Sequence, residues 1–273
     1  MMRLFIIILF FVIFPTTLFA QFGELPPDPI GTMDISGVKA EIVINLLVDR
    51  SFLLNPIPEG FTLGKPPAYY TKHLDNIPDT TQLAFTSLLI IIADSIVIND
   101  IPIKSINGSL PAITLLWVWV EEPREVFDDR AIGNQGYISQ MDYYPNSDLV
   151  NKYKALGIPA EYGISEVSPR SDGWNVIFKI NHSEMRIVTK YKNEPTPMNY
   201  TLPAFMTVWY STKRPSLFTI FTYYGHYVQD CDIQIETSGN HKLIKLIQNG
   251  LIHDHLPADI QSEWRAKSGI YRR

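Results

Sequence analysis

Short runs of β-branched and aromatic residues recur along most of the chain and predict strands. Val38–Val48 alternates apolar and polar residues before it becomes apolar, Leu83–Ile98 is rich in Leu, Ile and Ser, and Ile113–Glu121 has the sequence ITLLWVWVE. Similar runs are Gly136–Tyr144, Gly163–Val167, Trp174–Ile180, Met185–Tyr191, Phe205–Tyr210, Phe218–Tyr224 and Asp232–Glu236. Turn clusters such as Asn107-Gly108 separate them. This spacing predicts a mainly β fold, an antiparallel barrel or double sheet.

Helical patterns are few and short. Ser147–Leu156 begins with an acceptable N-cap, Ser147, and stops before Gly157. His241–Ile247 has apolar residues at helical spacing, and Pro257–Ala266 is predicted to form a last short helix over the barrel mouth. The few short helices leave the expected fold predominantly β.

The first 20 residues have the pattern of a secretory signal peptide. Arg3 precedes an apolar run from Leu4 to Phe14, and a small residue, Ala20, ends the segment. The run is shorter than the roughly 20 residues that span a bilayer, and Pro15 interrupts it. We therefore expect cleavage after Ala20, with an uncleaved anchor as the alternative. The mature protein is expected to be secreted, or periplasmic in a bacterium, and to leave the membrane.

The rest of the chain is predicted to hold one domain. Residues 21–37 are rich in Pro and Gly and are expected to form an extended N-terminal arm. Residues 38–273 contain neither internal repeats nor a low-complexity linker, which favours a single domain. Cys231 is the only cysteine, so the chain has no internal disulfide, and we expect a buried thiol there.

Charge and motifs exclude several classes of function. The net charge is −5 and there is no basic block, so nucleic-acid binding is not expected. His253-Asp254-His255 could place two rings near one ion, but no third ligand can be assigned. Phosphate-binding and dinucleotide-binding fingerprints are absent from the sequence. We therefore predict neither a metal site nor a cofactor, and expect a small molecule as partner.

Aromatic residues supply candidate ligand contacts. Trp117 and Trp119 lie two positions apart and therefore share a face of their strand. Tyr224 ends another aromatic strand. Large aromatic side chains on barrel strands either fill the core or line a ligand cavity, and both interpretations stay open here.

Three stretches, in the same order, resemble acetoacetate decarboxylase-type proteins. Asp49–Phe61 is similar to the family segment in which a short helix leads into a Pro-x-Gly turn. Tyr137–Pro159 resembles the strand and short helix that precede the family's Gly-Phe/Tyr-Pro-Lys-Lys motif. Glu166–Val188 is similar to the hairpin that follows. The resemblance covers roughly residues 38–250, and it implies that family's β fold and, by analogy, homo-oligomers.

The chain departs from that family at its chemical centre. Where the motif carries lysines, Pro159 is followed by Ala160 and Glu161. Schiff-base chemistry needs an amine nucleophile with a depressed pKa, which neither residue supplies. Lys152 and Lys154, in the preceding helix, are expected to be solvated.

The leading hypothesis is a secreted, acetoacetate decarboxylase-like protein with an apolar cavity for a small organic acid or a similar ligand, acting without the lysine or only binding as a pseudoenzyme. An enzymatic version, a lyase or hydrolase, would use Glu161 as general acid or base and Tyr162 as hydrogen-bond donor. The sequence leaves open whether the protein is an enzyme. A lipocalin-like extracellular carrier or a structural β protein is the alternative from another class.

Overall fold

The computed structural model describes residues 29–59, 61–64, 83–121, 135–198, 205–210, 217–224, 226–250, 258–263 and 265–272. Strands dominate this part of the chain, which contains two α-helices, so the predicted mainly β fold is confirmed. The predicted signal peptide, residues 1–20, and residues 21–28 of the predicted arm lie outside the described residues. Within the described ranges, no helix is both long and apolar enough to cross a membrane.

The elements follow one another as a series of strands with short helices inserted. In chain order they are β1 (Gly31–Asp49), η1 (Arg50–Phe52), β2 (Thr62–Leu63), β3 (Leu83–Ile98), β4 (Ile101–Pro102), β5 (Ala112–Glu121), β6 (Gln135–Tyr144), α3 (Ser147–Ala155), β7 (Ala160–Tyr162), β8 (Ile164–Arg170), β9 (Gly173–Ile180), β10 (Ser183–Tyr191), β11 (Thr196–Met198), β12 (Phe205–Tyr210), β13 (Leu217–Tyr224), β14 (His226–Ser238), α4 (Lys242–Asn249), β15 (Ala258–Ser262) and β16 (Arg265–Arg272).

Two sequence-based predictions are wrong at the ends of the chain. Ala258–Ser262 forms β15 and Arg265 begins β16, where a short helix was predicted. These segments are strands because β15 pairs with β1 and β14, and β16 pairs with β1 and β13. The predicted arm is also too long, because Gly31–Ser36 belongs to β1, where it pairs with β3 and β16. Neighbouring strands outweigh the local propensity in both places.

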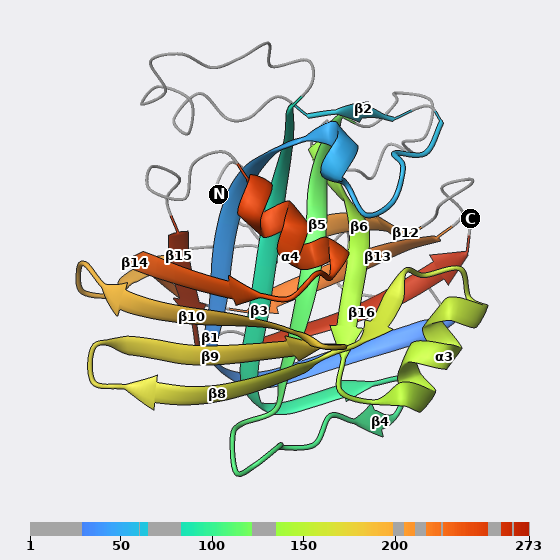
Figure 1. The fold of residues 1–273 in the computed structure, drawn as a ribbon. Helices are drawn as coiled ribbons and strands as arrows, with labels where there is room; N and C mark the ends of the chain where they lie inside the picture. Colours follow the sequence, from blue (N-terminus) through green and yellow to red (C-terminus); the bar gives the residue numbers. More distant parts are fainter. Residues whose placement is uncertain are drawn as a thin grey trace, which may run out of the picture.

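A long first strand links two curled halves of one sheet (Figure 1). The strands β3, β5, β6, β12, β13, β16 and β1 form a ring that closes because β1 also pairs with β3. Along its other edge, β1 pairs first with β16 through Gly31–Ile35 and then with β15 through Glu41–Ile44. From β15 the sheet continues through β14, β10 and β9 to β8. Because β12 lies parallel to β6, the up-and-down barrel of the lipocalin-like alternative is not observed.

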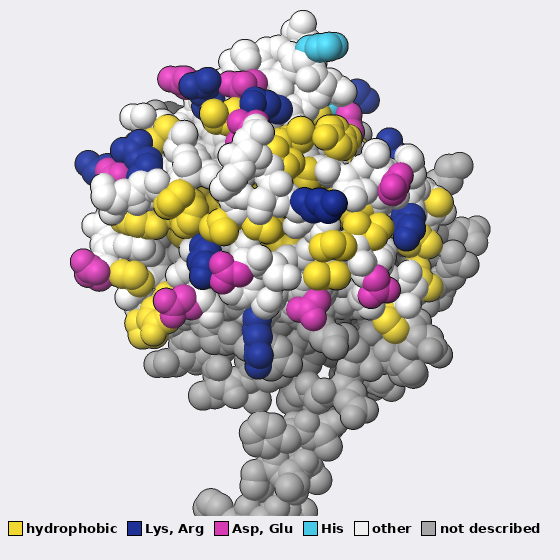
Figure 2. Space-filling view, turned by 90° about the horizontal axis from the view of Figure 1, so that it is seen from below, with side chains coloured by type: hydrophobic (Ala, Val, Ile, Leu, Met, Phe, Trp, Pro, Cys, Tyr) yellow, Lys and Arg dark blue, Asp and Glu magenta, His cyan; other side chains and the backbone are white. Residues whose placement is uncertain are grey.

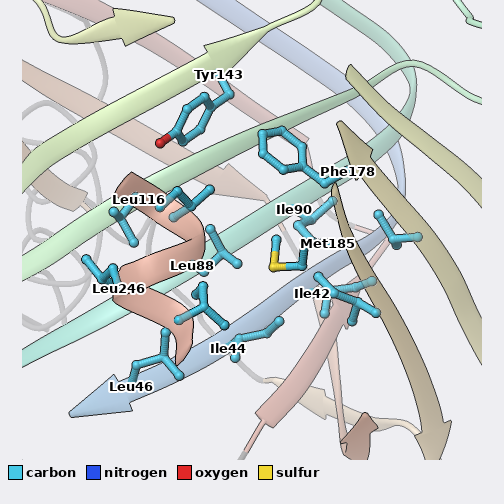
Figure 3. Packing of buried hydrophobic residues seen from close by; sticks show 14 of the residues in the cluster. Ile42, Ile44, Leu46, Leu88, Ile90, Leu116, Tyr143, Phe178, Met185 and Leu246 are labelled. Carbon is cyan, nitrogen blue, oxygen red and sulfur yellow. The ribbon is translucent and has the colours of Figure 1, made fainter. Parts of the chain in front are cut away.

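Buried side chains form two main clusters on opposite faces of β1, β3 and β5. The α4 core lies where α4 covers β1 and β3 and includes the residues drawn in Figure 3, among them Ile42, Leu88, Leu116 and Leu246. The barrel core lies inside the ring and includes Ile35, Leu89, Ile91, Leu115 and Trp117. Each fully buried aliphatic side chain contributes about 1.5–3 kcal/mol of hydrophobic free energy. Cys231 is buried in the α4 core, as predicted.

The helix α3 and its ends position the next strand, β7. Its N-cap is Asn146, one residue earlier than predicted, whose Oδ1 accepts the Leu149 N–H at 2.9 Å. The helix ends at Ala155 with Leu156 as its C-cap, and Gly157 follows with a φ of 79°, which glycine adopts readily. The chain then turns back, and the Asp142 N–H donates to the Pro159 carbonyl oxygen at 2.9 Å. This bond aligns β7 with the end of β6.

Charged side chains of both signs are interspersed with hydrophobic ones on the described face shown in Figure 2. Ion pairs at the surface include Lys39 with Asp94 at 2.8 Å and Lys192 with Asp232 at 2.7 Å. Exposed pairs of this kind contribute little to stability, typically about 0–1 kcal/mol each. The stability of the fold therefore comes mainly from the two cores.

Candidate functional site

The strand β7 places consecutive residues on opposite faces of the sheet. It runs parallel to the end of β6, with Ala160 beside Asp142 and Glu161 beside Tyr143. Side chains alternate along a strand, so Ala160 packs in the barrel core while the Glu161 side chain lies on the face of the α4 core. The side chains of the two residues that follow Pro159 therefore lie in different environments, one in the barrel core and one beside the α4 core.

Glu161 is held by two polar side chains that are distant in the sequence. Its Oε2 lies 3.2 Å from the His241 Nε2, which is also 3.3 Å from Oε1. The Asn181 Nδ2 donates to Oε1 at 3.2 Å. The side chain of His241 is 13% exposed and that of Glu161 is 28% exposed, so water reaches the carboxylate while the imidazole is largely covered. This pair is the first element of the candidate site.

The helix α4 determines which imidazole nitrogen faces Glu161. His241 is the N-cap residue of α4, and its Nδ1 accepts the Leu243 N–H at 3.2 Å. A neutral imidazole that accepts at Nδ1 carries its proton on Nε2. We therefore assign Nε2–H as the donor to the Glu161 carboxylate, so that His241 orients Glu161 without needing a positive charge.

The turn before α4 fixes the position of this histidine. The backbone N–H of His241 donates to the Ser183 Oγ at 3.1 Å. Gly239 has a φ of +94°, and a Cβ there would lie 2.3 Å from the same hydroxyl oxygen. Only glycine combines this backbone conformation with such a close approach. The β9–β10 hairpin therefore contributes to the site twice. Its Asn181 donates to Glu161 directly, and its Ser183 holds the backbone of His241.

Tyr143 completes the site from β6. The residue is 1% exposed, and its ring packs edge-to-face on Phe178, with centroids 5.2 Å apart, and beside the His241 ring at 6.4 Å. Figure 3 shows its hydroxyl oxygen (red) directed away from Phe178. Among the described residues this hydroxyl has no hydrogen-bond partner. Burial raises the pKa of Tyr143 well above its ordinary value, and the negative charges of Glu161 and Asp142 add to the shift. The phenol is therefore a neutral, desolvated donor.

A second polar group lies on the opposite face, beside Ala160. Asp142 is fully buried and accepts hydrogen bonds from the Ser139 Oγ at 2.8 Å and the Tyr144 hydroxyl at 3.0 Å. The Tyr144 ring packs against Tyr153 of α3. Sequence reasoning passed over Asp142, although a carboxylate on the inward face of an aromatic strand is a recognisable signal.

The aromatic residues predicted to bind a ligand lie in the ring and not beside Glu161. Trp117 and Trp119 share a face, as predicted, and the Tyr137 ring lies 5.6 Å from each. Trp117 belongs to the barrel core, on the face of the sheet opposite to the α4 core. The side chain of Tyr224 lies outside the described residues, and only its backbone pairing with Arg265 is defined.

The other predicted residues lie apart from the site. Tyr162 is 46% exposed and, one residue after Glu161, points to the opposite face of β7, so it does not accompany the carboxylate as the predicted donor. Instead, Tyr143 and His241 lie beside the carboxylate, and the sequence analysis did not identify either of them as a site residue. Lys152 and Lys154 are exposed on α3, as predicted. His253-Asp254-His255 lies outside the described residues, and the described part of the chain contains no cluster of potential metal ligands.

No protein-family model matches the sequence, and no curated protein matches it either. Solved structures do match the fold. The chain is similar to acetoacetate decarboxylase from Legionella pneumophila subsp. pneumophila str. Philadelphia 1, with a TM-score of 0.52, 12% identity and coverage of 94% of each chain. It is also similar to an acetoacetate decarboxylase-like enzyme from Sphingomonas wittichii RW1, with a TM-score of 0.51, 11% identity and coverage of 92% of this chain and 98% of that one.

The sequence identities are too low to infer an activity from these proteins. The structural similarity nevertheless extends over nearly the whole length of both chains. The two curled halves of the sheet match the architecture of these structures. This chain has the fold of the acetoacetate decarboxylase-like proteins.

Proposed function

We propose that this protein binds a small organic acid or a similar carbonyl compound at Tyr143, Glu161 and His241, without forming a Schiff base. The observation that carries the proposal is the buried Tyr143 hydroxyl, which has no hydrogen-bond partner among the described residues. A buried donor without an acceptor costs about 1–3 kcal/mol. A ligand oxygen that accepts this hydrogen bond would recover that free energy.

The charge of the Glu161 carboxylate favours a neutral ligand oxygen, rather than a second carboxylate, beside Tyr143. The Glu161 carboxylate lies on the same face and would repel a second carboxylate in direct contact. A neutral keto or ester oxygen accepts from Tyr143 without this penalty. The ligand class is therefore best represented by a keto acid whose carboxylate points away from Glu161, or by a neutral ketone.

Two observations support a function without a catalytic lysine. Ala160 and Glu161 occupy the positions after Pro159 where the resemblance predicts lysines. Each lysine whose side chain the structure describes is exposed or partly exposed. A lysine acquires the depressed pKa that a Schiff base requires through burial or a close cation.

The test is ligand binding by the purified protein lacking residues 1–20, with acetoacetate and 2-butanone as probes. We expect saturable binding in calorimetry, no lysine adduct after borohydride reduction with acetoacetate, and at least a tenfold weaker affinity in Tyr143→Phe. The variant should fold normally, because it removes a hydroxyl without a described partner. Tyr153→Phe, in α3 and buried in the barrel core, is the matched control. A covalent adduct, or equal affinity in Tyr143→Phe, would contradict the proposal.

Secretion is part of the proposal and depends on Met1–Ala20. The basic start, the apolar run and the small residue at position 20 favour cleavage by a signal peptidase. Mass spectrometry of the protein made in its own cell should find Gln21 as the first residue. Recovery of the intact protein with Met1–Ala20 attached to a membrane fraction would contradict secretion.

A second candidate function is an enzyme of lyase or hydrolase type that uses Glu161 as acid or base. The contact between Glu161 and His241 favours it, because an oriented carboxylate is a suitable general base. Turnover of keto acids or lactones should then disappear in Glu161→Gln. The control variant Glu166→Gln changes a carboxylate that is paired with Lys179 instead.

A further inference from the structure

We propose that the Tyr143–Glu161–His241 site transfers a proton at the carbon next to a carbonyl group, and so interconverts the keto and enol forms of a small carbonyl compound. This inference rests on the proposed binding of a carbonyl oxygen by Tyr143. It adds a reaction to the binding and assigns a role to each side chain.

The site combines the two groups that such a reaction needs. Tyr143 and Glu161 are paired residues on neighbouring parallel strands, β6 and β7, and their side chains lie on one face. The His241 ring links the two side chains, because its centroid lies 6.4 Å from that of the Tyr143 ring and its Nε2 lies 3.2 Å from the Glu161 Oε2. In this reaction, one small ligand contacts the phenol with its oxygen and the carboxylate with its C–H group.

The contacts of Glu161 suit a general base. The His241 Nε2–H and the Asn181 Nδ2 fix the orientation of the carboxylate, and His241 is itself held by α4 through its Nδ1. An ionised carboxylate has about four acceptor positions, so these two donors leave acceptor capacity for a proton from the ligand. His241 acts through Glu161 and is a positioning residue.

The step balances without an added reagent. The C–H bond next to the carbonyl breaks, its proton forms an O–H bond with a Glu161 oxygen, and its electron pair becomes the C=C bond of the enolate. The former C=O electrons move onto the oxygen, where the Tyr143 O–H group stabilises the charge. Return of a proton from Glu161 to the carbon, or to the oxygen, completes the interconversion. Because the Glu161 side chain is 28% exposed, its proton exchanges with water.

The experiment measures deuterium incorporation into pyruvate and 2-butanone in D₂O by ¹H NMR, in a buffer without carboxylates. We expect exchange of the protons next to the carbonyl that is faster than in buffer alone. Glu161→Gln should lower the protein-dependent rate about 100-fold or more, the usual contribution of a general base. Glu166→Gln, whose side chain pairs with Lys179, should exchange as the wild type does. In His241→Asn, which keeps an acceptor at the start of α4, the pH dependence of the rate should shift.

The outcomes separate this inference from the binding on which it depends. Exchange at the buffer rate, or an equal rate in wild type and Glu161→Gln, overturns the proton-transfer proposal. If calorimetry still shows binding that weakens in Tyr143→Phe, the binding proposal stands while the reaction fails. If calorimetry detects no binding of acetoacetate or 2-butanone and NMR detects no exchange with pyruvate or 2-butanone, both proposals fail. A rate that depends on Glu161 and a pH profile that depends on His241 support the inference.

Discussion

Tyr143 is the residue whose environment most constrains the chemistry of the site. Its ring is enclosed by Phe178 and His241, while its hydroxyl has no partner among the described residues. Tyr153 of α3, in the barrel core, is also buried, and its pKa is raised mainly by desolvation. Ionising either phenol inside the protein is unfavourable because burial penalises the charged form.

This burial predicts a loss of stability at high pH. A folded-state pKa raised above the ordinary value of 10.0 means that the stability is complete below about pH 10 and falls as the pH rises above it. Each affected tyrosine contributes a slope of up to about 1.4 kcal/mol per pH unit. Urea denaturation between pH 8 and 12 should show a smaller fall in the free energy of unfolding for Tyr143→Phe, and a smaller one still when Tyr153→Phe is added. Identical slopes in all three proteins would contradict this prediction.

At the scale of elements, α4 connects the site to the core. Its residues Leu243, Ile244, Leu246 and Ile247 are buried against β1 and β10, and its N-cap is the histidine that contacts Glu161. The strand β7 forms the remaining side of the site, and it follows the turn at Gly157 that comes after α3. A small displacement of either helix end would therefore separate the carboxylate from its partners.

The N-cap predicts different effects for two variants of one residue. His241→Ala removes both the acceptor for the Leu243 N–H and the donor to Glu161, and should lower the free energy of unfolding by about 1 kcal/mol. His241→Asn keeps a cap acceptor and should lose clearly less. Amide hydrogen exchange at Leu243 should accelerate in the alanine variant and stay slow in the asparagine variant. Equal destabilisation by both substitutions would show that the cap is unimportant.

At the scale of the whole molecule, β1 joins the two halves into one structure. It pairs with β3 along nearly its full length, with β16 at its start and with β15 further on. The α4 core and the barrel core lie on opposite faces of the same strands. Because the two cores share these strands, disruption of one core would also expose the other to water. We therefore expect the two halves to unfold together.

Cooperative unfolding can be measured with a substitution in only one of the cores. Leu246→Ala, in the α4 core, should cost about 2–5 kcal/mol. Far-ultraviolet circular dichroism and tryptophan fluorescence should shift to the same lower urea midpoint, because Trp174 lies in the α4 core and Trp117 in the barrel core. Two separate transitions in the variant would instead indicate two independent domains.

Local pattern determined most of the elements in this chain. The runs Leu83–Ile98 and Phe205–Tyr210 match β3 and β12, and the helices near residues 147–156 and 241–247 are both present. Alternation along a strand also placed Trp117 and Trp119 on one face. These features follow from periods of two and about 3.6 residues, which neighbouring residues encode by themselves.

Long-range pairing decided what local pattern could not. The C-terminal segment became β15 and β16 because β1, 200 and more residues earlier, offered an edge for each. Glu161 contacts His241 across a separation of 80 residues. Alternation along β7 turns Tyr162 to the face opposite to Glu161, and alternation along β5 places Trp117 in the barrel core. Which strands become neighbours depends on backbone hydrogen bonds and shared core surface, which no short window of sequence contains. Local sequence pattern thus predicted most of the strands and the candidate carboxylate, whereas long-range pairing decided the C-terminal strands and the partners of the carboxylate.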